Sequence, residues 1–257
     1  MATHLAAYLV SDYGKTEVEL SVVKDDVLTQ TAATRFMVPV GLNNVHWAYA
    51  AGANLTEAYL KSPSLEVRRH KPRIIPGNYG ALSLDLNKIP VWKPVRPLTL
   101  SETEELSVIA SYGGTAAAYN LALVALGPPA LPPVPAGEIR MIKLTSSTAL
   151  TAGAWTTCIM TPEVALEVGT YALVGFIPIS AGALAARAIF TGQYWRPGVP
   201  AIAGSDPGAR VINDKYLKDL QFYEMGRFTH NSLPMFQFLS SSADTSETVY
   251  AYIVKVA

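Results

Sequence analysis

Polar and apolar residues alternate in short runs along the first half of the chain. A period of two residues is typical of strands that place one face on a core. Pro39 interrupts one run, which favours an edge strand or a bulge there, and the proline-rich residues 89–98 predict a loop without ladder partners. The predicted strands are residues 16–22, 35–40, 45–49, 65–69, 81–86, 106–111 and 119–126. We expect the last two to form a hairpin around Gly113-Gly114-Thr115.

The second half shows similar short runs separated by turn residues. A proline- and glycine-rich excursion covers residues 192–208, and one helix is predicted over residues 213–220. That helix has Asn213 as its capping residue and leucines 217 and 220 at helical spacing. The predicted strands are residues 138–144, 155–160, 171–177, 184–190, 220–224, 235–240 and 248–256.

A proline-rich stretch separates the two halves. Five prolines lie between Gly127 and Gly137, and proline supplies no donor N–H to a helix or sheet. Such a stretch favours an extended polyproline II path and acts as a semi-rigid spacer. We therefore expect three parts: a β-barrel over residues 1–127, a linker over residues 128–136 and a second β-barrel over residues 137–257.

The two halves resemble each other in the order of their runs. Residues 106–124 and residues 236–254 are both predicted to form a strand, a turn of small residues and a second strand. Residues 59–77 resemble residues 184–204 in the placement of their proline and glycine residues after a strand. Short strands at regular spacing without alternating helices indicate sandwiches or barrels. The predicted fold class is all-β: two tandem jelly-roll-like β-barrels or sandwiches joined by a proline-rich linker, with one short helix in the second.

Composition favours a protein that associates with copies of itself. Twenty basic and twenty acidic residues cancel, which argues against a free nucleic-acid binder, and hydrophobic residues make up 50% of the chain. The single cysteine, Cys158, lies in a predicted strand and is expected to be a buried, inert thiol. The first residues lack a basic segment followed by an apolar block, so we expect no secretory signal and synthesis in the cytoplasm.

No catalytic, cofactor-binding or metal-binding motif stands out. The histidines are His4, His46, His70 and His230, and none has the spacing of a metal site. Nucleophile elbows, phosphate-binding glycine loops and dinucleotide fingerprints are missing from the sequence. We therefore expect a protein that is not an enzyme, with no catalytic, cofactor or metal residues to assign.

The strongest charge feature is a basic cluster made of Arg68, Arg69, His70, Lys71 and Arg73. One interpretation is contact with an anionic partner, namely nucleic acid, lipid headgroups or an acidic patch on a neighbouring subunit. The other is a solvated strand end whose arginines pair with local acids.

The tryptophans divide into two pairs. Trp47 and Trp155 lie in alternating runs and are expected in the core. Trp92 and Trp195 lie in proline-rich loops, where rigid aromatic surfaces suit subunit contacts, and Trp195 is the preferred interface residue.

The duplication and strand order resemble the double jelly-roll major capsid proteins of tailless icosahedral viruses. That resemblance implies a virion protein forming homotrimers whose six barrels make a pseudo-hexagonal capsomer within an icosahedral shell. Its implied partners are copies of itself, other virion proteins and an internal membrane or packaged genome, contacted through Arg68, Arg69, Lys71 and Arg73. The chain departs from the family in being short, with little room for tower insertions.

Two alternatives remain open at this point. One is a non-enzymatic, two-domain β-sandwich that binds carbohydrate or a receptor. The other is a hydrolase or isomerase on a bicupin-like scaffold, which the small number of histidines disfavours.

Overall fold

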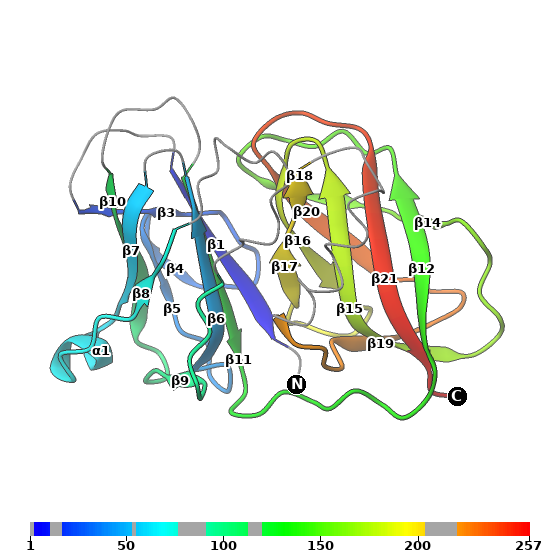
Figure 1. Ribbon diagram of the computed structural model, residues 1–257, viewed down its shortest axis with the longest axis horizontal. Helices are drawn as coiled ribbons and strands as arrows, with labels where there is room; N and C mark the ends of the chain where they lie inside the picture. The colour runs from blue at the N-terminus through cyan, green and yellow to red at the C-terminus, as the bar shows by residue number, and fades with distance from the viewer. Residues whose placement is uncertain (1–2, 11–16, 53–54, 77–90, 113–119, 204–219) are drawn as a thin grey trace. The chain divides into compact units, whose positions relative to one another are not determined.

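The computed structural model describes residues 3–10, 17–52, 55–76, 91–112, 120–203 and 220–257 (Figure 1). The chain divides into two compact units. The first unit is Leu5–Pro129, and the second unit is Met1–His4 together with Ala130–Ala257.

The described part of the first unit contains two sheets and one helix, α1 (Pro63–Val67). One sheet has the order β3-β1-β11-β6-β9, and the other has the order β4-β5-β10-β7-β8, with β2 also paired to β10. The strands are β1 (His4–Val10), β2 (Val18–Glu19), β3 (Ser21–Val22), β4 (Gln30–Ala32), β5 (Arg35–Met37), β6 (Asn44–Ala51), β7 (Leu55–Lys61), β8 (Arg73–Ile74), β9 (Leu98–Thr99), β10 (Glu105–Tyr112) and β11 (Asn120–Gly127).

The described part of the second unit also contains two sheets. One has the order β14-β12-β21-β15-β18, with β19 also paired to β15, and the other has the order β13-β20-β16-β17. The strands are β12 (Ile139–Ser146), β13 (Trp155–Cys158), β14 (Thr161–Pro162), β15 (Thr170–Ser180), β16 (Ala183–Ile189), β17 (Gly198–Pro200), β18 (Ile202–Ala203), β19 (Gly226–Thr229), β20 (Met235–Ser240) and β21 (Glu247–Lys255).

The same strand order occurs in both units. In one sheet of each unit, the last strand lies between the first strand and a long middle strand: β1-β11-β6-β9 corresponds to β12-β21-β15-β18. In the other, β5-β10-β7-β8 corresponds to β13-β20-β16-β17. These are the two four-strand sets of a jelly roll, which confirms the predicted fold class. One pairing differs, since β9 is antiparallel to β6 whereas β18 is parallel to β15.

The predicted hairpin of residues 106–111 and 119–126 is wrong. β10 pairs with β7, for example at Val108↔Leu60, whereas β11 pairs with β6 in the other sheet. β20 and β21 likewise belong to different sheets. The connection therefore crosses from one sheet to the other. A polar turn is needed in both cases, so turn residues do not distinguish a crossing from a hairpin.

The central strand β6 is more buried than its alternation predicted. All eight of its residues are buried, so neither face is open to solvent. Its polar side chains are satisfied by hydrogen bonds within the first unit: Thr99 Oγ1 donates to Asn44 Oδ1 over 2.8 Å, and His46 Nε2 lies 2.7 Å from the carbonyl oxygen of Pro128. In this strand, alternating polarity therefore does not mark an exposed face.

The predicted strand at residues 65–69 is instead the helix α1. Ser62 caps its N-terminus, because the Ser62 Oγ accepts from the Leu65 N–H over 3.4 Å, and Pro63 occupies the first turn. At the other end, Arg69 has a φ of 53°. The N–H groups of Arg69 and His70 donate to the carbonyls of Glu66 and Leu65 over 3.0 and 2.9 Å. This pair of hydrogen bonds is a Schellman motif, which usually places glycine where Arg69 stands.

Several smaller expectations are also corrected. Residues 220–224 form no strand, whereas β19 was not predicted. The loop at residues 89–98 does have a ladder partner, since Trp92 bridges Ala48 through two backbone hydrogen bonds. The predicted strand at residues 81–86 and helical residues 213–219 lie outside the described residues. No helix in the described part of the chain is long and apolar enough to cross a membrane.

The proline-rich linker is held at both of its ends. Within the first unit, the Pro128 carbonyl oxygen contacts His46. Within the second unit, the Glu224 N–H donates to the Pro132 carbonyl over 3.1 Å, and Val134 packs on the cluster of Ala172, Val174 and Val254.

Replacing Ser62 with alanine removes the α1 cap, and we expect this to lower the free energy of unfolding by about 1 kcal/mol. Urea denaturation monitored by circular dichroism measures the change. Thr29→Ala, at an exposed position before β4, is the control and should stay within about 0.5 kcal/mol of the parent protein. Equal stability of the Ser62→Ala variant and the parent would contradict the capping role.

Candidate functional site

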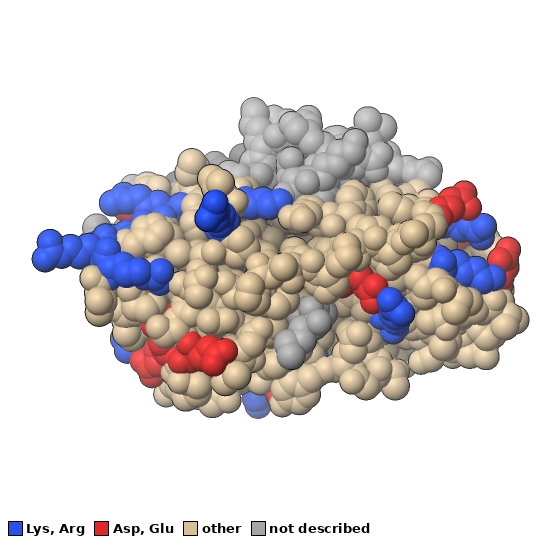
Figure 2. Space-filling view, turned by 90° about the horizontal axis from the view of Figure 1, so that it is seen from below, with Lys and Arg blue, Asp and Glu red and all other residues tan. Residues whose placement is uncertain are grey.

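The basic cluster predicted from the sequence follows α1 on the surface of the first unit. All five side chains are exposed: Arg68, Arg69, His70, Lys71 and Arg73. Figure 2 shows lysine and arginine side chains gathered at the left end of the view, where α1 and the neighbouring β7 and β8 lie in Figure 1. Basic side chains therefore gather on this part of the first unit's surface.

Two of the five residues hold the unit together. Arg68 Nε donates to the Ser64 carbonyl over 3.1 Å, and its Nη2 donates to the Thr99 carbonyl over 2.8 Å. Arg73 forms an ion pair with Glu57. Pairing with a local acid, the second interpretation of the cluster, therefore holds for Arg73, whereas Arg68 is held by carbonyl oxygens.

The other three residues line a cavity of about 450 Å³, which we call the α1 pocket. Its wall includes α1, the end of β7 and the segment that leads to β8. The lining residues are Tyr59, Leu60, Lys61, Leu65, Glu66, Arg69, His70 and Lys71.

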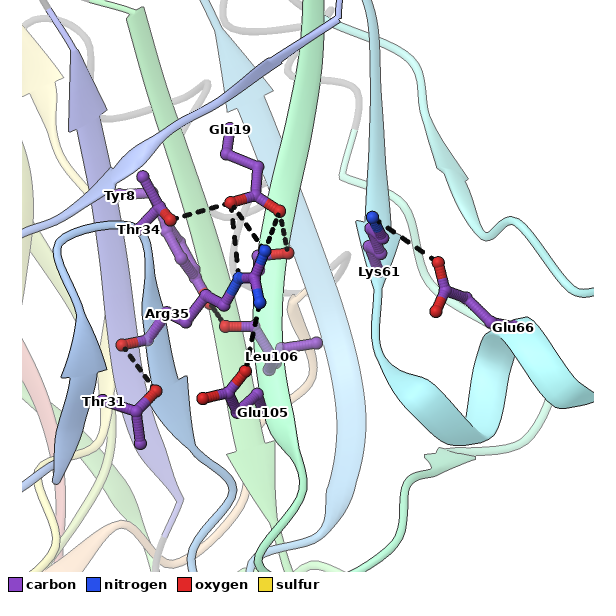
Figure 3. A network of polar contacts seen from close by, with 10 residues as sticks. Tyr8, Glu19, Thr31, Thr34, Arg35, Lys61, Glu66, Glu105 and Leu106 are labelled. Atoms are coloured by element: carbon purple, nitrogen blue, oxygen red, sulfur yellow. Dashed lines mark hydrogen bonds and ion pairs between the residues drawn. The ribbon is translucent and has the colours of Figure 1, made fainter.

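Two contacts position charges in the α1 pocket. The Lys71 ammonium lies 4.9 Å from the centroid of the Tyr59 ring, within the range of a cation–π interaction. Lys61 Nζ lies 3.5 Å from Glu66 Oε1, and this ion pair joins β7 to α1 (Figure 3). Of the charged groups in the wall, three are cations and one is a carboxylate, and that carboxylate already has a cation beside it. The pocket thus has an excess of positive charge.

A second charged group lies nearby, in which one arginine is shared by two carboxylates. Arg35 on β5 contacts Glu19 on β2 at 3.1 Å and Glu105 on β10 at 3.2 Å (Figure 3). Burial acts to raise the pKa of Glu19, but hydrogen bonds from Thr34 and Arg35 outweigh it and lower that pKa. This network ties three strands together, so its carboxylates serve the sheet.

The second unit has a smaller pocket with an aromatic wall. Its volume is about 270 Å³, and the predicted interface residue Trp195 lies in the wall beside Tyr194, with ring centroids 5.3 Å apart. Tyr194 is 64% exposed. We call this the aromatic pocket. It is lined by Pro132, Gln193, Tyr194, Trp195, Glu224, Met225 and Gly226.

The other tryptophans have different surroundings. Trp47 is buried, as predicted, and Trp92 is half-buried. Trp155 is not a core residue: it is half-buried, and the guanidinium of the fully buried Arg187 lies 4.2 Å from its ring centroid. Arg187 Nε also donates to Gln237 Oε1 over 2.7 Å. The alternation of β13 did not indicate that a cation would occupy this face.

One buried acid, Glu247, was not indicated by any pattern in the sequence. It is 1% exposed at the start of β21, opposite Ser146 in the register. Neither carboxyl oxygen makes a hydrogen bond of ordinary geometry, although polar groups of Ser146 and Thr148 lie near enough to oppose the rise of its pKa. Burial, with a contribution from the negative charge of Asp244, raises the pKa of Glu247 to about 7. A carboxyl at the edge of an alternating run looks exposed in the sequence, which is why it was missed.

Two sequence expectations concern the cysteine and metal binding. Cys158 is fully buried as predicted, and burial raises the pKa of its thiol to about 11, so the reactive thiolate is disfavoured. Within the described ranges, no three His, Cys, Asp or Glu side chains come together as a metal site would require.

Comparisons with known proteins give one structural similarity. No protein-family model matches the chain, and no curated protein matches it. Among solved structures, the chain is similar to the major capsid protein P2 from bacteriophage PM2, at 9% sequence identity and a TM-score of 0.25, over 98% of each chain. At that TM-score, the similarity carries no argument about function.

The raised pKa of Glu247 predicts a pH-dependent stability. The folded carboxyl keeps its proton up to about pH 7, whereas the unfolded one releases it near its ordinary pKa of about 4.5. Glu247 therefore contributes stability at low pH that is lost as the pH rises through 7. Relative to Glu247→Gln, the parent protein should lose roughly 1–2 kcal/mol of unfolding free energy between pH 5 and pH 8.

Urea titrations of both proteins at the two pH values measure this difference. Glu163→Gln on an exposed loop provides the control for removing one carboxylate. A parent and a Glu247→Gln variant with parallel pH profiles would contradict the assignment.

Proposed function

We propose that this protein is a structural, non-enzymatic subunit that self-assembles into a viral capsid. The observation that carries the proposal is the repetition of one jelly-roll strand order twice in a single chain. Jelly rolls are a common architecture of viral capsid domains. Two similar units per chain provide two similar tiles, and three chains provide six, which suits near-hexagonal packing on a shell.

Exposed aliphatic side chains of the second unit support self-association. Ile159, Val164 and Val168 are 74%, 73% and 78% exposed, on the connections that flank β14. Covering exposed aliphatic side chains with a partner removes them from water and so lowers the free energy. The balanced net charge leaves little long-range repulsion between copies.

The finer form of the proposal is a homotrimeric capsomer in an icosahedral virion, in contact with other virion proteins. The basic cluster would face an internal membrane or the packaged genome. Because Arg68 and Arg73 are engaged within the first unit, Arg69 and Lys71 are the members of the cluster that support such a contact.

A two-domain carbohydrate-binding protein is the second candidate. The aromatic pocket favours it, because an exposed tyrosine beside a tryptophan, with the polar side chains Gln193 and Glu224 in the same wall, suits a sugar ring. A monomer that binds glycans through Tyr194 would support this candidate over the capsid subunit.

Assembly is tested by multi-angle light scattering and electron microscopy of the purified protein. We expect species of three times the chain mass and, at higher concentration, ordered shells or sheets. The double variant Ile159→Glu/Val164→Glu should shift the population toward monomer, because it places charge at two of these exposed aliphatic positions. Thr29→Glu/Gln30→Glu, at exposed positions of the first unit, adds the same charge and is the matched control. A parent protein that stays monomeric at high concentration contradicts the proposal.

A second prediction concerns the linker. Replacing Pro128, Pro129, Pro132, Pro133 and Pro135 with glycine and serine keeps the backbone carbonyls and Val134. Each unit should stay folded, with a lower urea midpoint because the unfolded chain gains conformational freedom. Ordered assembly should be impaired, because the connection between the units becomes more flexible. Intact shells from this variant would show that the stiffness of the linker is not needed.

A further inference from the structure

The α1 pocket brings together cations from separate segments of the first unit. Lys61 comes from the end of β7, Arg69 from the turn after α1, and Lys71 from the segment before β8, with the His70 imidazole in the same wall. Glu66 is the only acid in that wall, and it already pairs with Lys61. A compact anion entering the pocket therefore meets several donors and only one carboxylate in the wall, which already has a cation beside it. Outside the wall, the carboxylate of Glu17 accepts from the Tyr59 hydroxyl over 3.5 Å.

Arg69 is the most informative of these residues. It takes the left-handed conformation at the position of the Schellman motif where glycine is favoured. Its guanidinium makes no hydrogen bond or ion pair with another described residue, so no contact within the unit accounts for an arginine there. Arg69 thus places the several N–H donors of a guanidinium at the pocket wall, although its backbone conformation is one that glycine adopts more readily.

We propose that the α1 pocket binds a single phosphate group. Arginine matches the geometry of phosphate oxygens with paired donors, and the two lysines supply compact positive charge. Lys71 is held over the Tyr59 ring, which limits its freedom before binding. The cavity, about 450 Å³, is large enough for a phosphate with the group that carries it.

A polynucleotide fits this arrangement less well. Binding along a strand requires a groove or stripe of cations that tracks successive phosphates. The two arginines that would extend the pocket into a stripe, Arg68 and Arg73, are held by Thr99 and Glu57. The free cations converge on one concavity instead.

Two kinds of ligand could supply this phosphate group: a free phosphate in solution or the headgroup of an anionic lipid. Val67 and Ile75, which flank the cluster in sequence, are 85% and 74% exposed, and such side chains would contact the apolar part of a lipid but not a free anion. The site does not depend on the proposed capsid function, since it lies within one unit of one chain.

The test measures inorganic phosphate binding to the full-length protein by isothermal titration calorimetry. Arg69→Gly is the central variant, because it removes the guanidinium and also relieves the left-handed backbone, so lost binding cannot be ascribed to unfolding. We expect its affinity for phosphate to fall about tenfold, with a similar loss for Lys71→Gln. Arg73→Gln removes the same charge beside the pocket and is the matched control, with an expected change below about twofold. Arg69→Lys should retain part of the affinity.

A second arm uses co-sedimentation with phosphatidylcholine vesicles with and without phosphatidic acid. Binding to the acidic vesicles that is competed by phosphate and lost in Arg69→Gly identifies a lipid headgroup; phosphate binding without vesicle binding identifies a free phosphate. Equal phosphate affinity of the parent, Arg69→Gly and Arg73→Gln would overturn the proposal. A uniform loss across all charge-removing variants would also overturn it, by showing a general charge effect. Single-stranded DNA binding that phosphate does not compete would point to a polyanion surface instead.

Discussion

Each unit depends on the insertion of its last strand into the middle of a sheet. β11 lies between β1 and β6, and β21 lies between β12 and β15. β21 pairs with both neighbours along nearly its whole length, from Ser146↔Glu247 to Tyr171↔Lys255. Until that strand is in place, the first and middle strands of the sheet have no partner between them. The core therefore forms only when residues more than a hundred positions apart in sequence come together, which makes the fold cooperative and its folding slow.

This central constraint leaves the connections free to differ between the units. The α1 pocket lies in the connection from β7 to β8, and the aromatic pocket takes Gln193, Tyr194 and Trp195 from the connection between β16 and β17. These two connections occupy the same place in the repeated strand order. One contains a short helix and cations, and the other contains aromatic rings. The duplicated scaffold thus presents two different chemistries from equivalent positions, as is common when binding groups are carried by loops on a rigid framework.

Most strands and the repetition of their order could be predicted from the sequence, because alternation and turn residues are local signals. The correspondence of residues 59–77 with residues 184–204 agrees with the equivalent places of β7-β8 and β16-β17. Sheet partners could not be predicted, since a chain reversal looks the same whether it joins paired strands or crosses between sheets. The β10–β11 connection is the example of this ambiguity.

The candidate sites were less predictable than the fold. The basic cluster was visible in the sequence. Which of its cations are engaged within the unit was not, because Arg68 bonds Thr99, which is distant in sequence, and Arg73 pairs with Glu57 on the neighbouring strand β7. Over residues 65–69, two apolar residues spaced by one imitate a strand, while Ser62 and Pro63 specify a helix start. The capping residues were the better guide here, because a run of five residues is too short to distinguish the period of a strand from that of a helix. Glu247 gave no signal, because its burial comes from neighbouring strands.

The linker also shows how tertiary contacts change the meaning of a local pattern. Five prolines predict a spacer that is stiff by itself. In the structure, Pro128 contacts His46 of the first unit, while Pro132 and Val134 contact the second unit. Only residues 129–131 lie between the last of these contacts on one side and the first on the other. Each end of the connection is therefore anchored within its own unit by contacts that the proline pattern does not reveal, and Pro129 fixes the φ angle of one residue between those anchors.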